Sequence, residues 1–140
     1  MINTKDVLRM KVPYPSVSDT LAVKPHMYIC KNVEETNYEF IKCQTLKPYM
    51  LTKNICKHYV DEVADVSRNP FQRATRIDCD KVFTTGSVVY SDGMKTTFRP
   101  DICQELYEKV LEELIADGFL TIPIEESDLV RINTLASWIS

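Results

Sequence analysis

The segment from Asp101 to Asp117 is the one stretch of this sequence that carries a complete helix pattern. Apolar residues recur at every fourth position, so they would form one stripe along a helix, with glutamates on the other faces. This stripe consists of Ile102, Leu106, Val110 and Leu114. Asp101 is expected to cap the first turn, and Gly118 to end the helix because glycine tolerates the left-handed conformation. The other apolar segments are short and bounded by proline or turn residues, which restricts the fold to strands with a few helices.

Alternating apolar and polar residues predict strands in the first part of the chain. These strands are Asp6–Tyr14, His26–Lys31 and Tyr38–Thr45. Pro13 and Pro15 end the first of them, because proline is excluded from the interior of a sheet. Residues 16–23 are expected to form a polar loop, and residues 32–37 a turn.

The second half of the chain mixes strand and helix signals. Residues 54–66 place apolar side chains near helical spacing, which predicts a helix inserted between strands. Residues 87–90 and 95–98 flank Asp92-Gly93, and an Asp-Gly pair between β-branched and aromatic residues predicts a hairpin. Residues 119–124 are expected to add a last strand, and residues 125–140 a short helix carrying Trp138.

Together these elements predict a mainly β (α+β) fold with an inserted helical segment and a C-terminal helix. A small antiparallel barrel is the natural way to close such short strands. At 140 residues the chain is expected to form a single domain. Its barrel would span about residues 6–100, its helix residues 101–117 and a C-terminal extension residues 119–140.

Charge is unevenly distributed along the chain. The net charge of −3 divides into +4 for residues 1–60, zero for 61–100 and −7 for 101–140. A basic first part is typical of a surface that binds a polyanion. The acidic C-terminal part is equally typical of the solvent-exposed face of a helix. No apolar run approaches the length of a membrane span, and the first residues lack the apolar core of a signal peptide, so we expect a cytoplasmic protein.

The five cysteines are odd in number and scattered, which favours reduced core residues over disulfides. Cys56 and His58 are two possible metal ligands, but no second pair follows at zinc-site spacing. We therefore predict no metal and no cofactor.

The ribbon from Ala74 to Thr85 concentrates charge in an unusual way. Read as one strand, it places three charged residues on one face and three apolar residues on the other. The charged face holds Arg76, Asp78 and Asp80, and the apolar face Ile77, Cys79 and Phe83. Neighbouring carboxylates raise the pKa of one of them, whereas an adjacent arginine lowers both, which equips such a group for acid–base work. The alternative is a solvated edge strand.

Several of these segments, taken in order, resemble the MazF/PemK (Kid) toxins of type II toxin–antitoxin systems. The first strand after Asp6, the loop that follows it and Lys24-Pro25-His26-Met27-Tyr28-Ile29 are similar to the opening of that family. Gln44-Thr45 stands where the family carries a functional threonine, and Cys79-Asp80-Lys81-Val82-Phe83-Thr84 where it has an Asp-Gln-x-Arg-Thr run. The resemblance covers roughly residues 6–118.

This resemblance implies an SH3-like barrel that dimerises, cleaves single-stranded RNA without metal and is silenced by an acidic antitoxin. Asp80 would be the base, Thr45 a phosphate hydrogen-bonding group and Lys24 the oxyanion stabiliser. An Arg-x-Asp motif of PemK-like members would correspond to Arg76-Ile77-Asp78 or to Asp78-Cys79-Asp80. Lys24 stands where the family has an arginine, so it lacks the planar guanidinium that binds phosphate with two hydrogen bonds. Phe83 stands at the position of a second family arginine.

Around these residues we expect an RNA-binding surface that includes Arg9, Lys11, His26 and Lys47. His26 is also a candidate general acid. Candidates for stacking on bases are Tyr14, Tyr28 and Tyr49. The catalytic prediction requires Lys24, Thr45 and the ribbon 76–80 to meet in one open pocket. Two alternatives remain: a non-catalytic barrel that binds nucleic acid or protein for a mobile element, and an extension that docks a partner through Trp138.

Overall fold

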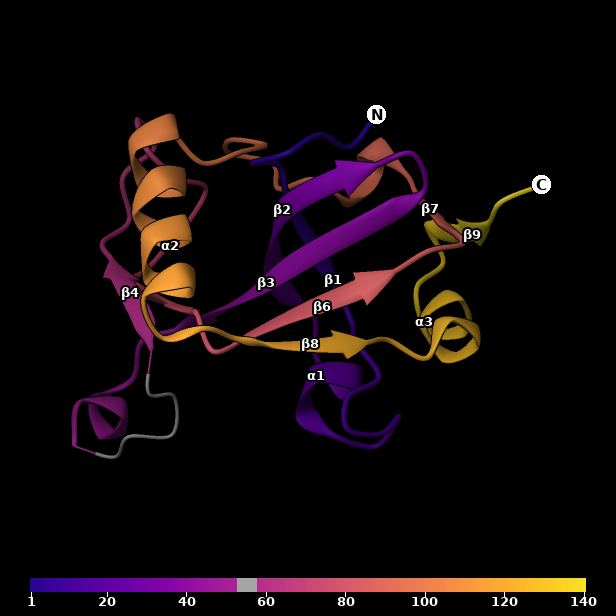
Figure 1. Ribbon diagram of the computed structural model, residues 1–140, viewed down its shortest axis with the longest axis horizontal. Coiled ribbons are helices and arrows are strands. Elements are labelled where there is room, and N and C mark those ends of the chain that lie inside the picture. Colours follow the sequence, from indigo (N-terminus) through magenta and orange to yellow (C-terminus); the bar gives the residue numbers. More distant parts are fainter. Residues whose placement is uncertain (53–57) are drawn as a thin grey trace.

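The computed structural model describes residues 1–52 and 58–140, and it is built mainly of antiparallel β-strands (Figure 1). Its strands are β1 (Val7–Met10), β2 (His26–Glu34), β3 (Asn37–Thr45), β4 (Tyr59–Glu62), β5 (Thr75–Asp78), β6 (Lys81–Thr85), β7 (Val88–Tyr90), β8 (Leu120–Pro123) and β9 (Ala136–Trp138). Its helices are α1 (Thr20–Val23), α2 (Gln104–Asp117) and α3 (Glu126–Ile132), with 3-10 turns η1 (Pro48–Leu51) and η2 (Asp92–Met94). The mainly β class is confirmed. Within 1–52 and 58–140, no helix is long and apolar enough to cross a membrane.

Strand β3 organises the larger sheet. It pairs with β2 along one edge, and along the other edge with β5 at its C-terminal end and β6 at its N-terminal end. The main order is β1-β2-β3-β5-β4, and β6 carries the parallel strand β8. In the described part of the chain, the end strands β1 and β4 do not pair with each other.

Both faces of the central part of this sheet pack against other elements. One face packs against α2, where Ile41 and its neighbours meet the helix stripe. The other packs against α3 and the small β7–β9 sheet, where Phe40 and Phe83 lie. Consecutive residues of β3 thus enter different hydrophobic clusters. Figure 1 shows α2 and α3 at opposite ends of the sheet.

The ribbon from Ala74 to Thr85 is two strands rather than the predicted one. Five of its residues, 78–82, lie opposite two residues of β3, 41 and 42. Because the excess is an odd number of residues, the faces are exchanged across the break. Ile77 and Cys79 therefore belong to the α2 cluster, whereas Phe83 belongs to the opposite one. The predicted shared apolar face is wrong for this reason.

The predicted helix over 54–66 is also wrong where the structure describes it, because residues 59–62 form β4. This strand pairs with β5, and Asp61 lies opposite Arg76. Val63 and Val66, two members of the expected stripe, are each 67% exposed, so no apolar face is buried there. The start of the predicted helix, up to residue 57, lies outside the described residues.

Three loop predictions need correction. Residues 16–23 include the short helix α1, and β2 continues to Glu34 so that the turn before β3 is confined to 35–36. The expected partner strand at 95–98 does not form, and β7 pairs with β9 instead. Lys95 and Thr96 instead lie beside β1. The Lys95 ammonium is 3.2 Å from a carboxylate oxygen of Asp6, and the Thr96 amide donates to the Val7 carbonyl.

The helix predicted at 101–117 is confirmed, with one change at its start. All four residues of the apolar stripe have no exposed surface. The cap is Cys103, whose sulfur accepts from the Leu106 amide at 3.5 Å, while the Asp101 carboxylate accepts from Arg99 at 2.8 Å. The strand expected at 119–124 is confirmed as β8. The expected C-terminal helix ends at Ile132, and Trp138 lies on β9.

Replacing Gly118 by alanine should lower the free energy of unfolding by about 1 to 3 kcal/mol. Gly118 ends α2 at φ 74° and ψ 171°, a region that is essentially restricted to glycine, and a Cβ there would meet no atom within 4 Å. The loss would therefore come from backbone conformation alone. Chemical denaturation measures it, with Gly93→Ala as control because Gly93 does not require a positive φ. Equal losses in both variants would contradict the conformational explanation.

Candidate functional site

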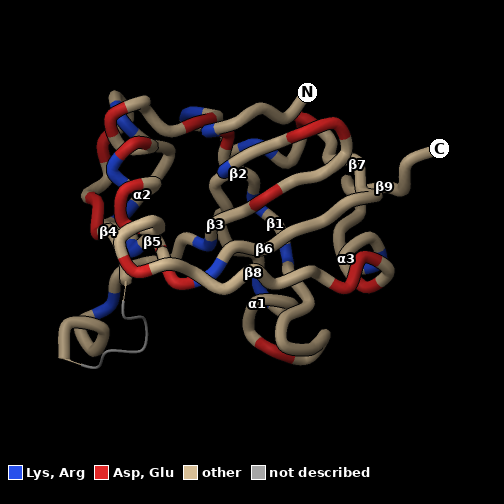
Figure 2. The backbone as a smooth tube through the Cα atoms, in the orientation of Figure 1, with Lys and Arg blue, Asp and Glu red and all other residues tan. Residues whose placement is uncertain are grey.

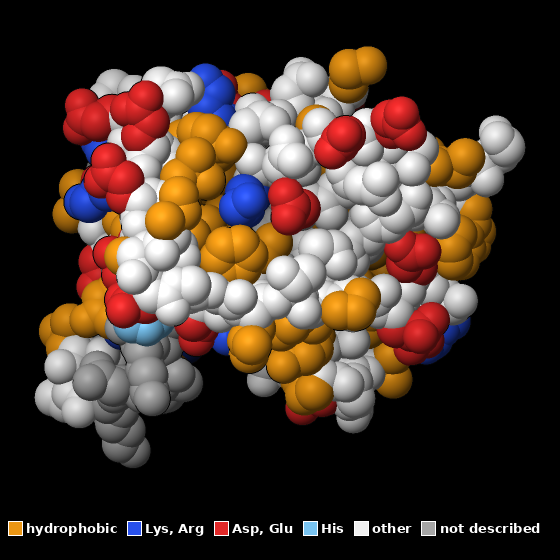
Figure 3. Space-filling view, viewed as in Figure 1, with side chains coloured by type: hydrophobic (Ala, Val, Ile, Leu, Met, Phe, Trp, Pro, Cys, Tyr) orange, Lys and Arg blue, Asp and Glu red, His pale blue; other side chains and the backbone are white. Residues whose placement is uncertain are grey.

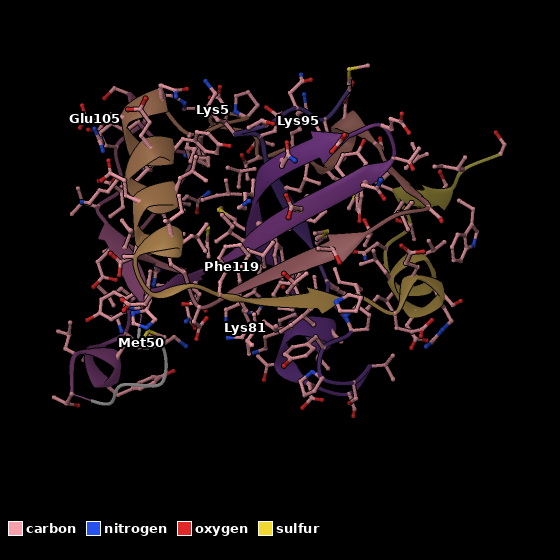
Figure 4. All side chains as sticks on the ribbon, in the orientation of Figure 1. Lys5, Met50, Lys81, Lys95, Glu105 and Phe119 are labelled. Atoms are coloured by element: carbon pink, nitrogen blue, oxygen red, sulfur yellow. The ribbon has the colours of Figure 1, made fainter. Side chains whose placement is uncertain are left out.

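A pocket of about 520 Å³ opens at one end of the larger sheet. Arg9, Met27 and Cys43 are register partners across β1, β2 and β3, so their side chains share one face of the sheet, and His26 and Gln44 line the pocket from the neighbouring positions. The loop before β5 and the turn η1 complete the lining. Met50, labelled in Figure 4 on η1, is one of these lining residues. The pocket is thus assembled from parts of the chain that are distant in sequence.

The lining of this pocket is cationic. It holds the side chains of Arg9, Lys24, Lys47 and Arg73, together with His26, and no aspartate or glutamate. All four cations are exposed, and none forms a salt bridge with the residues that the structure describes. The tube in Figure 2 shows that acidic residues concentrate elsewhere, along α2 and at the turn between β2 and β3. This pocket therefore presents a positive potential to an anion.

His26 is held in a defined tautomer at the pocket. Its Nδ1 lies 3.0 Å from the Lys24 carbonyl oxygen. A carbonyl can only accept, so Nδ1 carries the proton and Nε2 of the neutral ring keeps its lone pair. Burial lowers the pKa of His26, and the charges of Lys42 and Arg9 lower it further, against the opposing effects of this hydrogen bond and of Asp78. The imidazole is thus neutral near pH 7 and able to accept a proton.

Tyr49 is the predicted stacking residue that reaches the pocket. It lines the opening and is 46% exposed. Tyr14 and Tyr28 instead pack edge-on against Phe83, with ring centroids 5.3 Å and 6.1 Å from it. Of the three tyrosines, Tyr49 is therefore the one available to a ligand in this pocket.

Arg76 is buried, does not line the pocket and stabilises the fold. Its guanidinium donates two hydrogen bonds to the Asp61 carboxylate, at 2.8 and 2.9 Å, and one to the Met50 carbonyl at 3.1 Å. It also stacks 3.6 Å from the centroid of the Tyr59 ring and is 2% exposed. Strand pairing explains this placement: Arg76 lies opposite Asp61 of β4, and this pairing brings the Asp61 carboxylate and the Tyr59 ring to the guanidinium.

The two aspartates of the ribbon are held by lysines. Asp78 is 1% exposed, contacts the Lys42 ammonium at 2.8 Å and accepts from the Gln44 amide at 3.0 Å. Asp80 contacts the Lys81 ammonium at 3.0 Å. These lysines line a separate pocket of about 200 Å³. The solvated edge-strand alternative is wrong for Arg76 and Asp78, which are buried.

The structure therefore divides the predicted site. The pocket brings together Lys24, Thr45, Arg9, His26 and Lys47. It does not include Arg76, Asp78, Asp80 or Lys11. Both backbone polar groups of Lys11 bond the Asn133 side chain, at 2.9 and 2.8 Å, beside α3. Arg73 was missed, because no local pattern marks it and only the pairing of β5 with β3 brings its loop to the pocket.

Comparison of the chain with protein-family models, with curated proteins and with solved structures finds no match. A function for this chain has to be inferred from the pocket itself.

Proposed function

We propose that this chain binds single-stranded RNA through the cationic pocket, with a phosphodiester held among Arg9, Lys24, Lys47 and Arg73. The supporting observation is the lining itself: four exposed cations and no carboxylate surround one opening. Arginine grips phosphate oxygens with two parallel hydrogen bonds, and lysine adds a point charge. An exposed aromatic ring beside such charges is what single-strand binding requires, and Tyr49 supplies it.

Metal-independent cleavage of the bound RNA is the second candidate function, and the tautomer of His26 favours it. Nε2 would take the proton of a ribose 2′-hydroxyl, whose oxygen then bonds to phosphorus as the bond to the 5′-oxygen breaks. The departing 5′-oxygen takes a proton from water. Lys24 and Arg73 would stabilise the charge on the phosphorane oxygens. Asp80, the base implied by the family resemblance, is not among the lining residues.

The wider MazF/PemK interpretation extends this proposal. It adds a closed SH3-like barrel, a homodimer, action in the cytoplasm and an acidic antitoxin. A carboxylate-rich antitoxin segment would occupy the same cations as RNA and would inhibit by competition. A non-catalytic barrel that only binds nucleic acid is the alternative if no cleavage is found.

The double variant Lys24→Ala/Arg73→Ala should weaken binding of a single-stranded RNA oligonucleotide roughly 100-fold at low salt. Each charged hydrogen bond contributes about 1.5 kcal/mol, which corresponds to roughly tenfold in affinity. The slope of log K against log salt should become shallower by about 1.4, since each single-strand phosphate contact contributes about 0.7. Fluorescence anisotropy over a salt series measures both quantities.

Lys109→Glu is the matched control, because it changes the net charge by the same −2 at an exposed site on α2. It should bind like the unchanged chain. A loss equal to that of the double variant would mean that RNA responds only to net charge, and the pocket would not be the binding site.

A further inference from the structure

Three metal-ligating side chains meet between the start of β4 and the C-terminal end of α2. They are His58, Glu113 and Asp117. His58 Nδ1 lies 3.0 Å from an Asp117 carboxylate oxygen and 4.0 Å from a Glu113 oxygen, and the three donor atoms lie within 4.8 Å of one another. Figure 1 places this end of α2 beside β4, and Figure 4 shows Glu105 at the opposite end of the helix.

Each donor is positioned by an ordered element. Glu113 and Asp117 are four residues apart on α2, so they share one helix face. The His58 carbonyl accepts from the Cys79 amide at 2.7 Å, which anchors this residue beside the break between β5 and β6. The cluster therefore bridges two elements far apart in the sequence. In the sequence, His58 is close to only one other possible metal ligand, Cys56. Local spacing therefore does not indicate the cluster with Glu113 and Asp117.

We propose that this cluster binds a divalent transition-metal ion, with Zn²⁺ as the preferred ion. One imidazole and two carboxylates suit Zn²⁺, Mn²⁺ and Co²⁺, whereas Mg²⁺ and Ca²⁺ take oxygen ligands. Bonds of about 2.1 Å in a tetrahedral site place ligand atoms about 3.4 Å apart. The distances of 3.0 and 4.0 Å lie on either side of that value.

The side chains have room to adjust to an ion, because His58, Glu113 and Asp117 are 29%, 37% and 55% exposed. Three protein ligands leave a fourth position for water.

Charge also favours a cation here, because two carboxylates meet one imidazole and a divalent ion would compensate the charge of both carboxylates. Because the ligands come from α2 and from the residue before β4, the bound ion would join helix to sheet. It would bind the folded chain in preference to the unfolded chain and so raise its stability.

The test uses the full chain stripped of metal by a chelator, without nucleic acid. Calorimetric titration with Zn²⁺ should give one site per chain, and Zn²⁺ should raise the melting temperature, whereas Mg²⁺ and Ca²⁺ should not. Co²⁺ should give d–d absorption bands without a sulfur-to-cobalt charge-transfer band. A sulfur band, or no binding of Zn²⁺, would overturn the proposal.

Ligand variants identify the site. His58→Ala and Asp117→Asn should each lower the affinity for Zn²⁺ at least tenfold, which is about the least effect expected of a lost ligand. Glu112→Gln, with the same charge change on the same helix, and His26→Ala, which removes the other histidine, should bind Zn²⁺ as the unchanged chain does. If circular dichroism shows that His58→Ala does not fold, the Zn²⁺ affinity of Asp117→Asn is the deciding measurement, because Asp117 is exposed. Unchanged affinity in Asp117→Asn would then overturn the proposal.

Discussion

Replacing Arg76 by alanine should lower the free energy of unfolding by about 2 to 3 kcal/mol, because hydrogen bonds to a charged group contribute about 1.5 to 3 kcal/mol and the remaining Asp61 side chain, 32% exposed, can be hydrated. Arg76 is 2% exposed, and its guanidinium donates hydrogen bonds to the Asp61 carboxylate and to the Met50 carbonyl. Its removal leaves the Asp61 carboxylate and the Met50 carbonyl without these donors, and it removes the stacking partner of Tyr59. Strand β4 is paired through this contact to β5, so the edge of the sheet should loosen first.

Chemical denaturation followed by circular dichroism measures this loss. Arg73→Ala is the control, because it removes an exposed arginine three residues away and should change the stability by no more than about 0.5 kcal/mol. Arg76→Met should lose less stability than Arg76→Ala, because the longer apolar side chain fills more of the buried space beside the Tyr59 ring. If Arg76→Ala kept its stability and lost RNA affinity, Arg76 would belong to the binding site and not to the fold.

These two arginines illustrate what the sequence can predict about this site. Cations near strand ends were predicted to gather, and Lys24, Arg9 and Lys47 do line one pocket, because strand ends remain exposed whatever the pairing. The burial of Arg76 depends on strand pairing, since the register of β4 with β5 places Asp61 opposite Arg76. Register is a long-range property that alternation within one strand does not determine.

The same distinction holds for the fold. Helix α2 was predicted because its stripe and its terminal glycine are local signals. Strand β4 was missed because it is held by pairing with β5 and by the contact of Asp61 with Arg76, both across distant segments. The break at Cys79-Asp80 was missed because it is visible only against β3, where five residues lie opposite two.

Figure 3 shows hydrophobic side chains at the surface between α2 and the sheet. Phe119 follows the end of α2 at Gly118 and is only partly buried against the core. The Lys31 ammonium lies 5.5 Å from the centroid of its ring and covers it. This lysine thus shields an apolar ring, and it lies outside the cationic pocket.

Replacing His26 by alanine should reduce RNA cleavage by about 10² to 10⁴-fold, the range attributed to a general base. RNA affinity should change much less, because the neutral imidazole carries no charge for the phosphate. Gel analysis of a labelled single-stranded RNA, with excess enzyme, measures the cleavage step separately from binding. Asp80→Asn is the matched test of the family's base, and it should leave the rate nearly unchanged because Asp80 is held by Lys81 outside the pocket.

The pH profile gives the sign of the effect. Burial and neighbouring cations lower the pKa of His26 below the ordinary value of 6.5, so the neutral, active form persists below pH 6.5. The rate should therefore stay constant from neutral pH downward and fall only once the pH passes below that lowered pKa. Loss of cleavage in Asp80→Asn with full activity in His26→Ala would instead make the aspartate the base, and would require the Asp80–Lys81 contact to open toward the RNA. If the unchanged chain binds RNA and does not cleave it, the neutral imidazole is a contact for the bound strand and the pocket is a binding site alone.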